Sequence, residues 1–440
     1  PKIDRPDAAD CLHAQVGWMM SMRGTGAGSQ GEEVESIQAR VAALLRAGQP
    51  ALARNWIEQV SSGVDADGWV PAVFRADGSP APRMGQEARH ASQGQFVFMV
   101  MEYYRFTQDA EFLHRHYPVL KRTLDYVLAL RRDLEKNEWR LPEDERYLLE
   151  GLLPPSGART GSLKPVHLYS DHYWTLLAWK EERAAASILG LDQDAAWADE
   201  QYRLLRSAVR RSLRARMDQM EGTWIPASAE EERLDAESVA LLVWPCEETD
   251  LVEPHELQSS LDAFYEDFLL RYQPGWTGQI PSDESLMLTP LAQMGRGDYA
   301  REVLYALLDR RQPRGWQAWA NVAGSDPRQP GQAGPMPDIR VAAAYFTAVR
   351  GLAARESGKR LELFSGAPAE WLQHGEGFRT FGMPTAFGPL DLSGYWTKDL
   401  FTVEIGGGAR PPEGYRIWWP RQIAPERVLA NGKPIRTFDA

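Results

Sequence analysis

The chain has 440 residues and carries 49 Lys and Arg against 61 Asp and Glu, a formal net charge of −12. This acidic balance argues against nucleic acid and anionic membrane surfaces as partners, because affinity for phosphates comes mainly from clustered cations. No stretch reaches the ~20 apolar residues that a membrane span needs, and the two cysteines cannot form a disulfide framework or a Cys-rich metal site. The 16 Trp are unusually many. Their wide faces fill a core or line a site for ligands that stack, sugars above all.

Helical periodicity dominates the chain from about residue 7 to residue 357. The predicted helices span 7–22, 32–46, 50–62, 87–106, 110–134, 171–189, 192–217, 235–243, 255–271, 283–295, 297–310 and 338–356. Short turns join several of them, such as Thr107-Gln108-Asp109, so these neighbours are expected to be antiparallel. Longer connections at 63–86, 135–170 and 311–337 fall on alternate junctions. This pattern predicts a barrel of helical hairpins with a ligand face on the side of the long loops.

The composition changes after Gly358, where short β-prone runs are separated by Gly, Pro and Asn turns. The runs include 361–364, 400–404 and 415–419, and they predict a small antiparallel sheet domain. We therefore expect a helical domain over 1–357 and a β domain over 358–440. Because the chain starts at Pro1 rather than Met, we interpret it as a processed product or an excised fragment. That interpretation is compatible with an upstream domain, and it favours a periplasmic or secreted location over a cytoplasmic one.

One predicted helix starts directly after a Pro-rich loop with Asp171, His172, Tyr173 and Trp174. Asp171 has two explanations. It is a capping or first-turn acid that stabilises the helix, or it is a carboxyl presented beside two aromatic residues as a general acid or an acceptor for sugar hydroxyls. The sequence leaves both open.

Other candidate side chains stand at helix starts or in long loops. Those at helix starts are Glu87, His90, Gln93, Glu237, Asp283 and Glu284, and each has a capping or solvated-helix explanation beside a binding role. Trp316 and Trp319 fall in a long loop, where we predict a platform for a ligand. The histidines are scattered, and no cluster has metal-ligand spacing, so we predict no metal and no other cofactor.

Several longer strings carry a family likeness. They are Gly151–Ser156 with Pro165–Trp174, Ser92–Phe96 with Met101–Arg105, Glu237–Pro245, Gly334–Pro337, Gly382–Gly388 and Asn431–Lys433. Together they resemble bacterial members of the six-hairpin glycosidase superfamily, over most of the chain. The resemblance implies a mainly α fold, an (α/α)6 barrel followed by a small antiparallel β-sandwich, related to glucoamylase-like and α-L-rhamnosidase-like hydrolases. It also implies inversion with two carboxyl groups, and Asp171 matches the position of the general acid.

Two departures from the family pattern bear on activity. Related sequences carry an Arg-Asp pair on the second helix that resembles a sugar clamp, whereas Glu35 and Ser36 stand here. They also tend to read Trp-Ala-Glu where this chain reads Trp319-Ala-Asn321, and that Glu is the candidate base. An amide can orient a water molecule but cannot accept its proton.

Three interpretations of the missing base remain open. The base comes from another position, with Glu284 or Asp338 closest to the loops; or the protein is a catalytically impaired sugar-binding pseudoenzyme. In the third, a uronate lyase, Asn321 and His172 neutralise a carboxylate while Tyr169 or Tyr173 exchanges protons. The sequence thus predicts a glycoside hydrolase-like protein whose partner is an oligo- or polysaccharide, with substrate contacts from Glu87, His90, Gln93, His172, Tyr173, Trp174, Glu237, Trp316, Trp319 and Asn321.

Overall fold

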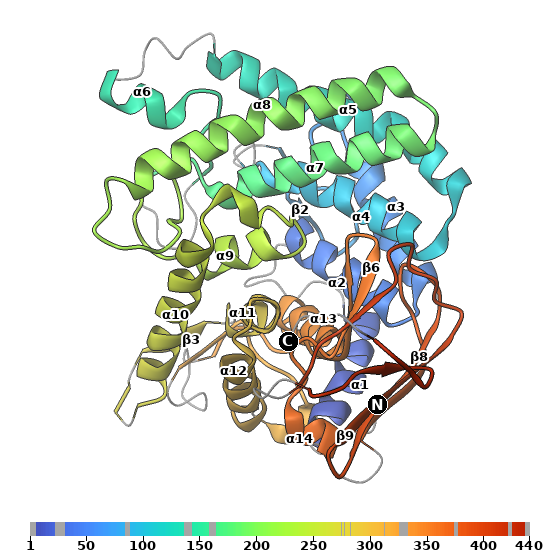
Figure 1. The fold of residues 1–440 in the computed structure, drawn as a ribbon. Helices are drawn as coiled ribbons and strands as arrows, with labels where there is room; N and C mark the ends of the chain where they lie inside the picture. Colours follow the sequence, from blue (N-terminus) through green and yellow to red (C-terminus); the bar gives the residue numbers. More distant parts are fainter. Residues whose placement is uncertain are drawn as a thin grey trace.

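The computed structural model describes residues 6–22, 31–83, 89–135, 143–157, 164–273, 275–276, 278–281, 283–311, 313–324, 333–373, 377–420 and 425–435. Within them, helices occupy most of the chain up to Ala353, and strands dominate after it. Figure 1 shows the strands of the C-terminal part gathered beside α1 and α13.

An inner ring of helices forms the centre of the molecule. Its members are α2 (Val34–Arg46), α4 (Ala91–Thr107), α7 (Tyr169–Ile188), α9 (Ala236–Val243), α11 (Asp283–Gln293) and α13 (Ile339–Ala353). Each packs against the next in this order, and α13 packs against α2, so the ring is closed. A ring of helices that is covered on its outer side must be apolar over much of its circumference. Long buried runs in α4 and α7 meet this requirement.

A second set of helices covers the ring. It consists of α1 (Pro6–Ser21), α3 (Pro50–Gly63), α5 (Ala110–Glu135), α8 (Asp192–Met217), α10 (Pro254–Arg271) and α12 (Gly297–Asp309). These alternate with the inner helices along the chain, and each packs on inner helices next to it in sequence. A short extra helix, α6 (Glu143–Leu149), packs on α8. The two rings form the (α/α)6 barrel that the sequence predicted.

Local signals explain several helix boundaries. Helix α10 starts at Pro254 with a capping box between Glu253 and Glu256, in which each side chain accepts a bond from the other residue's backbone N–H. Helix α13 ends at Ala353 instead of continuing to 356, because 354–357 form a strand. That strand pairs with the next one, β6 (Arg360–Leu363), so its backbone groups bond across the sheet and the helix does not extend further.

Most strands after α13 belong to two three-stranded sheets. In the first, β5 (Ala354–Ser357) pairs antiparallel with β6 (Arg360–Leu363), and β10 (Tyr415–Ile417) pairs with β6 in parallel. In the second, β8 (Leu390–Thr397) lies between β7 (Phe378–Met383) and β9 (Leu400–Gly407), with both pairs antiparallel. The sheets share a separate apolar core around Phe364 and Leu392. We call residues from Ala354 onward the β appendage. Its first strand starts before residue 358, where the sequence analysis placed the start of a separate β domain. That division into two domains stays a prediction.

Smaller elements complete the fold. They are the pairs β1 (Glu32–Glu33) with β2 (Val73–Phe74), β3 (Gln279–Pro281) with β4 (Val322–Gly324) and β11 (Leu429–Ala430) with β12 (Lys433–Pro434), the helix α14 (Ala369–Gln373), and the 3-10 turns η2 (Thr249–Leu251) and η3 (Arg314–Trp316). Among the helices of the described ranges, none combines the length and apolarity that crossing a membrane requires. The same ranges contain no group of three or more His, Cys, Asp or Glu placed to hold a metal ion.

Candidate functional site

The inner helices all run in the same direction. First-turn residues of α2, α9, α11 and α13 line one pocket, whereas last-turn residues of α2, α11 and α13 line another. This follows from the hairpin connectivity, since each outer helix returns the chain to the same end of the ring. The long loops after α3, α5, α8, α10 and α12 therefore lead into the N-terminal ends of the inner helices. Six helix N-termini at one end favour acids and hydroxyl oxygens there.

We call the cavity at this end the N-terminal pocket; its volume is about 90 Å³. Its polar lining residues are Glu35, Gln38, Glu237, Ser285, Thr289, Arg340 and Thr347, and its other lining residues are Ala39, Trp174, Ala240, Leu241, Trp244, Pro245, Leu286, Pro290, Ala343 and Ala344. The charged groups and Ser285 come from the first turns of the helices, whereas most of the other lining residues lie further along them. A mostly apolar cavity with a few convergent polar groups is typical of a small-ligand site.

Two carboxylates face this pocket from opposite helices. Glu35 lies in the first turn of α2 and Glu237 in the first turn of α9, and these helices are three positions apart around the six-membered ring. Asp235, and not Glu237, caps α9, because its side chain accepts bonds from the N–H and the hydroxyl of Ser238. Glu35 forms an ion pair with Arg340 on α13. The capping explanation for Glu237 is thereby replaced by a pocket-lining position.

Two tryptophans, Trp174 and Trp244, line the pocket. Trp174 is only 3 % exposed, and its indole N–H has no acceptor within the described part of the chain. The Phe98 ring meets Trp174 edge-on at 5.8 Å and Trp244 at 6.3 Å between centroids, which fixes both indoles. A Cβ added at Gly94 would lie 2.3 Å from the Trp174 carbonyl oxygen. Only glycine at this position lets α4 approach α7 so closely.

Asp171 and His172 anchor a loop and do not line the N-terminal pocket. The Asp171 carboxylate is 2 % exposed and accepts bonds from the Ser156 hydroxyl and from the Ala91 N–H at 3.1 Å, at the start of α4. His172 Nε2 accepts from Leu153 N–H at 3.0 Å, while Nδ1 bonds the Leu168 carbonyl at 2.6 Å. Burial lowers the pKa of His172 to about 4, so the ring is neutral at physiological pH.

The neighbouring candidates on α4 and α7 are also interior. His90, Gln93 and Tyr173 are buried. Burial lowers the pKa of His90 and raises that of Tyr173. None of the three lines the N-terminal pocket. Glu87 lies outside the described residues.

The two alternative bases occupy different surroundings. Glu284 is buried, and it accepts a bond from the Tyr272 hydroxyl at 3.1 Å and lies 3.7 Å from Arg271, both at the end of α10. Asp338 caps α13 by accepting from Val341 N–H at 3.0 Å. Burial is the main cause of a raised pKa for Asp338. Neither carboxyl lines the N-terminal pocket.

The loop tryptophans separate into one surface and one core residue. Trp316 is 50 % exposed, and its carbonyl accepts from Trp18 Nε1 at 3.0 Å. Trp319 is 8 % exposed, donates to the Leu307 carbonyl at 2.9 Å and packs against Tyr345. This packing does not support Trp319 as a ligand platform, because its ring packs against Tyr345 and its N–H is bonded to the Leu307 carbonyl. Asn321 is half-buried against Gly334 and is not among the residues that line the N-terminal pocket.

Of the pocket residues, only Trp174 and Glu237 were among the sequence candidates, and the charged or amide- or hydroxyl-bearing residues that the sequence did not select include Glu35, Gln38, Ser285 and Arg340. Gln38 lies one turn after Glu35, and Ser285 and Arg340 follow candidates that the sequence did select, Glu284 and Asp338. Comparing equivalent first-turn positions across all inner helices would have indicated them.

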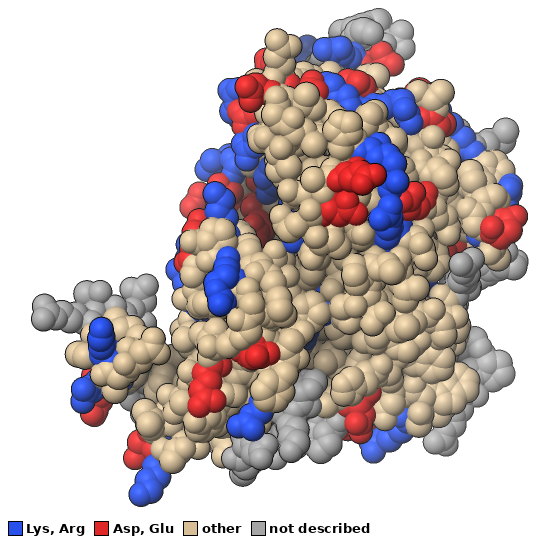
Figure 2. Space-filling view, turned by 90° about the vertical axis from the view of Figure 1, so that its right-hand side faces the viewer, with Lys and Arg blue, Asp and Glu red and all other residues tan. Residues whose placement is uncertain are grey.

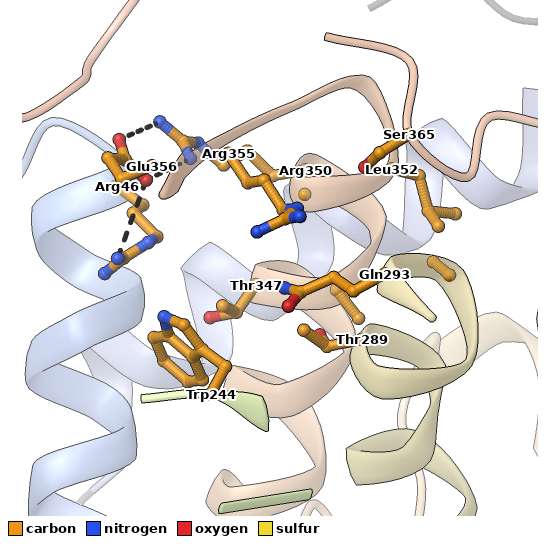
Figure 3. Close-up of a pocket in the computed structure, with 13 residues that line it drawn as sticks. Arg46, Trp244, Thr289, Gln293, Thr347, Arg350, Leu352, Arg355, Glu356 and Ser365 are labelled. Carbon is orange, nitrogen blue, oxygen red and sulfur yellow. Dashed lines mark hydrogen bonds and ion pairs between the residues drawn. The ribbon is translucent and has the colours of Figure 1, made fainter. Parts of the chain in front are cut away.

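Charged side chains and the β appendage lie at the opposite end of the barrel. Figure 3 shows Arg46, Glu356 and Arg350 together above Trp244. Glu356 is held by Arg350 through two bonds of 2.7 Å and lies 3.6 Å from Arg46, which also pairs with Glu102 at 2.7 Å. The cavity here measures about 20 Å³, room for about one water molecule. A larger cavity of about 850 Å³ lies nearby, between α1, the end of α13 and β7 of the β appendage.

Figure 2 shows one face of the molecule, on which Lys and Arg are interspersed with Asp and Glu.

Comparison with known proteins agrees with this geometry. The chain resembles a GH78-family rhamnosidase of Bacillus sp. GL1, with 12 % identity and a TM-score of 0.59 over 94 % of this chain and 42 % of that one. It also resembles an α-L-rhamnosidase from Dictyoglumus thermophilum, with 11 % identity and a TM-score of 0.59 over 99 % and 47 % of the two chains. A wild-type glycosidase matches with 13 % identity and a TM-score of 0.58 over 80 % and 99 %.

The chain thus spans less than half the length of the two rhamnosidases. No curated protein sequence matches it. The profile of the bacterial α-L-rhamnosidase six-hairpin glycosidase domain matches residues 33–324, more than half of the chain. This match and the closed double ring of helices establish that the chain belongs to the family of bacterial α-L-rhamnosidase six-hairpin glycosidase domains.

Proposed function

We propose that the chain hydrolyses a glycosidic bond of an oligo- or polysaccharide in the N-terminal pocket. The observation that carries this proposal is the pair of carboxylates, Glu35 and Glu237, on opposite inner helices beside Trp174 and Trp244. Glycosidases use two carboxyls that flank the scissile bond, and tryptophans suit sugar rings. A rhamnosidase from Klebsiella oxytoca of the same fold was solved with rhamnose bound, and a glycosidase of this fold in complex with glucose. Those ligands support a saccharide substrate here.

The reaction we propose is inversion at the anomeric carbon. One carboxyl protonates the departing glycosidic oxygen, and the other removes a proton from an attacking water on the opposite face of the sugar. Inverting enzymes keep the two groups roughly 6.5–9.5 Å apart to leave room for this water. Carboxyls that project from opposite sides of a ring of helices suit that requirement better than two on adjacent helices.

The family resemblance and the geometry of the pocket favour different residues as the general acid. The family resemblance implies Asp171, whose burial and two hydrogen-bond donors favour an anchoring role for the loop at 153–157 and for the start of α4. Glu284 and Asp338 are engaged with α10 and with the start of α13. We therefore propose that both catalytic carboxyls belong to the N-terminal pocket and that Asp171 supports the site from outside it.

Turnover of a panel of aryl glycosides and oligosaccharides tests the proposal. Glu237→Gln should lower kcat/KM by about 10²- to 10⁴-fold, the usual contribution of general acid–base catalysis, with an unchanged Tm. Asp171→Asn and Ser156→Ala should lower Tm together, because both break the same buried bond. If Asp171→Asn abolishes turnover at unchanged Tm while Glu237→Gln is fully active, the acid is Asp171 and our assignment is wrong.

Binding without turnover by the wild type would instead identify a sugar-binding pseudoenzyme. An unsaturated product would identify a lyase. Product stereochemistry followed by NMR checks inversion directly, since retention of the anomeric configuration contradicts the water-bridged arrangement.

A further inference from the structure

Glu182 is a carboxyl enclosed in the wall of the barrel. It lies on the inner helix α7, which packs against α4, α5, α8 and α9. Its side chain is fully buried, and neither carboxyl oxygen has a hydrogen-bond partner within the described part of the chain. The cations on the α4 and α9 sides are engaged elsewhere, because Arg105 pairs with Glu181 and Lys180 pairs with Glu248. A buried carboxyl without donors favours its protonated form.

The outer helices α5 and α8 supply the groups that face Glu182. They are Tyr117, Lys121 and Asp125 of α5 and Asp194 of α8. The Tyr117 hydroxyl donates to Asp194 at 2.8 Å, and the Lys121 ammonium pairs with the same carboxylate at 3.2 Å. The hydroxyl proton and the cation are thus both directed at Asp194. Glu182 lies beside two other acids whose charges oppose its own ionisation.

We infer that Glu182 is a pH-sensitive switch that is protonated when α5 and α8 are packed firmly on α7 and that loosens this packing when it ionises. In the protonated form its O–H can donate to the Tyr117 oxygen, while the Tyr117 proton stays on Asp194. One chain of hydrogen bonds then joins three helices. The ionised form has no proton to donate, and it repels Asp194 and Asp125. This switch lies in the barrel wall and depends on no assumption about the reaction.

The pH range of the switch follows from its surroundings. Burial is the main cause that raises the pKa of Glu182, from its ordinary value of 4.5 to about 7, and the charges of Asp194 and Asp125 act in the same direction. Tyr117 and Lys121 oppose this effect. Because folding raises the pKa, the folded state keeps a proton that the unfolded chain has lost. The stabilisation is therefore fully present below pH 4.5, declines as the pH rises, and is lost above pH 7.

Urea unfolding of the wild type and of Glu182→Gln at pH 4 and pH 9 tests the switch on the full chain. Glutamine keeps the shape of the side chain and cannot ionise. The unfolding constant of the wild type relative to that of Glu182→Gln should rise by about 10²-fold between these pH values. Asp199→Asn is the matched control on α8, since Asp199 forms surface ion pairs with Arg183 at 2.6 Å and Arg203 at 3.0 Å. The same ratio for this control should not rise with pH.

Infrared spectroscopy follows the proton itself. The wild type should show a C=O band of a protonated carboxyl that is absent in Glu182→Gln and that disappears as the pH rises through about 7. Lys121→Met removes a cation and should move the midpoint of this titration to higher pH, whereas Asp194→Asn removes a like charge and should move it to lower pH. A side chain that only packs would produce neither displacement. The titrations of the wild type and of Lys121→Met need no folded Glu182→Gln.

Hydrogen exchange measures the loosening. At pH 9, backbone amides of α5 and α8 should exchange faster in the wild type than in Glu182→Gln, and at pH 5 their rates should be close to equal. If the wild type lacks the infrared band, or unfolds with the same pH dependence as Glu182→Gln, the buried carboxyl is not protonated and the inference is overturned. If Glu182 titrates while exchange in both helices stays equal to that of the variant, ionisation does not loosen the packing, which overturns the switch as well.

Discussion

Glu356 offers a sharp test of how the barrel and the β appendage are held together. Its carboxylate, in β5, receives both terminal nitrogens of Arg350 at 2.7 Å and lies 3.6 Å from Arg46 (Figure 3). These guanidinium groups lower the pKa of Glu356 from its ordinary value of 4.5 to about 2, against the opposing effect of burial. Replacing Glu356 with Gln removes the charge while keeping the shape of the side chain.

The expected loss of folding stability follows from the difference between the pKa values of Glu356 in the folded and unfolded states. A carboxyl whose pKa falls from 4.5 to about 2 on folding stabilises the folded state by about 3 kcal/mol at neutral pH. Breaking one partner of a buried ion pair costs about 3–5 kcal/mol, because the remaining charges lose their compensation. Glu356→Gln should therefore lower the free energy of unfolding by about 3 kcal/mol at pH 7.

The pH dependence has a defined sign. Because folding lowers the pKa of Glu356, its contribution is fully present well above pH 4.5 and is lost as the pH falls towards 2. Between pH 6 and pH 4 the difference between wild type and variant should shrink by about 1 kcal/mol.

Urea unfolding at pH 7 and pH 4, followed by tryptophan fluorescence, measures both effects. Glu413→Gln is the matched control, since Glu413 forms a surface ion pair with Arg360 at 2.8 Å and should cost less than about 1 kcal/mol. Equal losses for the two variants at pH 7, or a Glu356→Gln loss that does not change with pH, would refute the reasoning.

Three further predictions concern packing and titration. Gly94→Ala should lower the free energy of unfolding by about 1–3 kcal/mol and weaken saccharide binding, because the new methyl group meets the Trp174 carbonyl at 2.3 Å. The control is Gly17→Ala, which has nothing within 4 Å of the added methyl group and should leave Tm equal or higher. Equal Tm values for the two variants would contradict the packing argument. Trp319→Leu should lower Tm and leave saccharide affinity unchanged in calorimetry, since Trp319 packs in the core; lost affinity at constant Tm would restore it as a ligand platform. His172 should titrate near pH 4 by NMR, so its contribution to stability is present above pH 6.5 and is lost as the pH falls towards 4; titration near 6.5 would show that the ring is not buried as described.

Hydrogen-bond partners explain why several candidates were ambiguous in the sequence. An acid at the start of a helix has the same local pattern whether it caps the helix or faces a ligand. Asp235 caps α9 and thereby leaves Glu237 to the pocket, while Asp338 caps α13 itself. Asp171 neither caps its own helix nor lines the pocket, because it accepts hydrogen bonds from the Ser156 hydroxyl and from the backbone at the start of α4. Contacts between segments that are distant in the chain decide among these roles.

The sequence by itself determined the helical hairpins, the alternation of short turns and long loops, and the change to strands near residue 358. These features depend on periodicity and turn chemistry, which act over a few residues. Only the tertiary structure decided which side chains share a pocket. Glu35, Glu237 and Arg340 come from helices far apart in the chain, and they meet because α13 closes the ring against α2. Ring closure is a global property of packing, so no local pattern in the sequence records it.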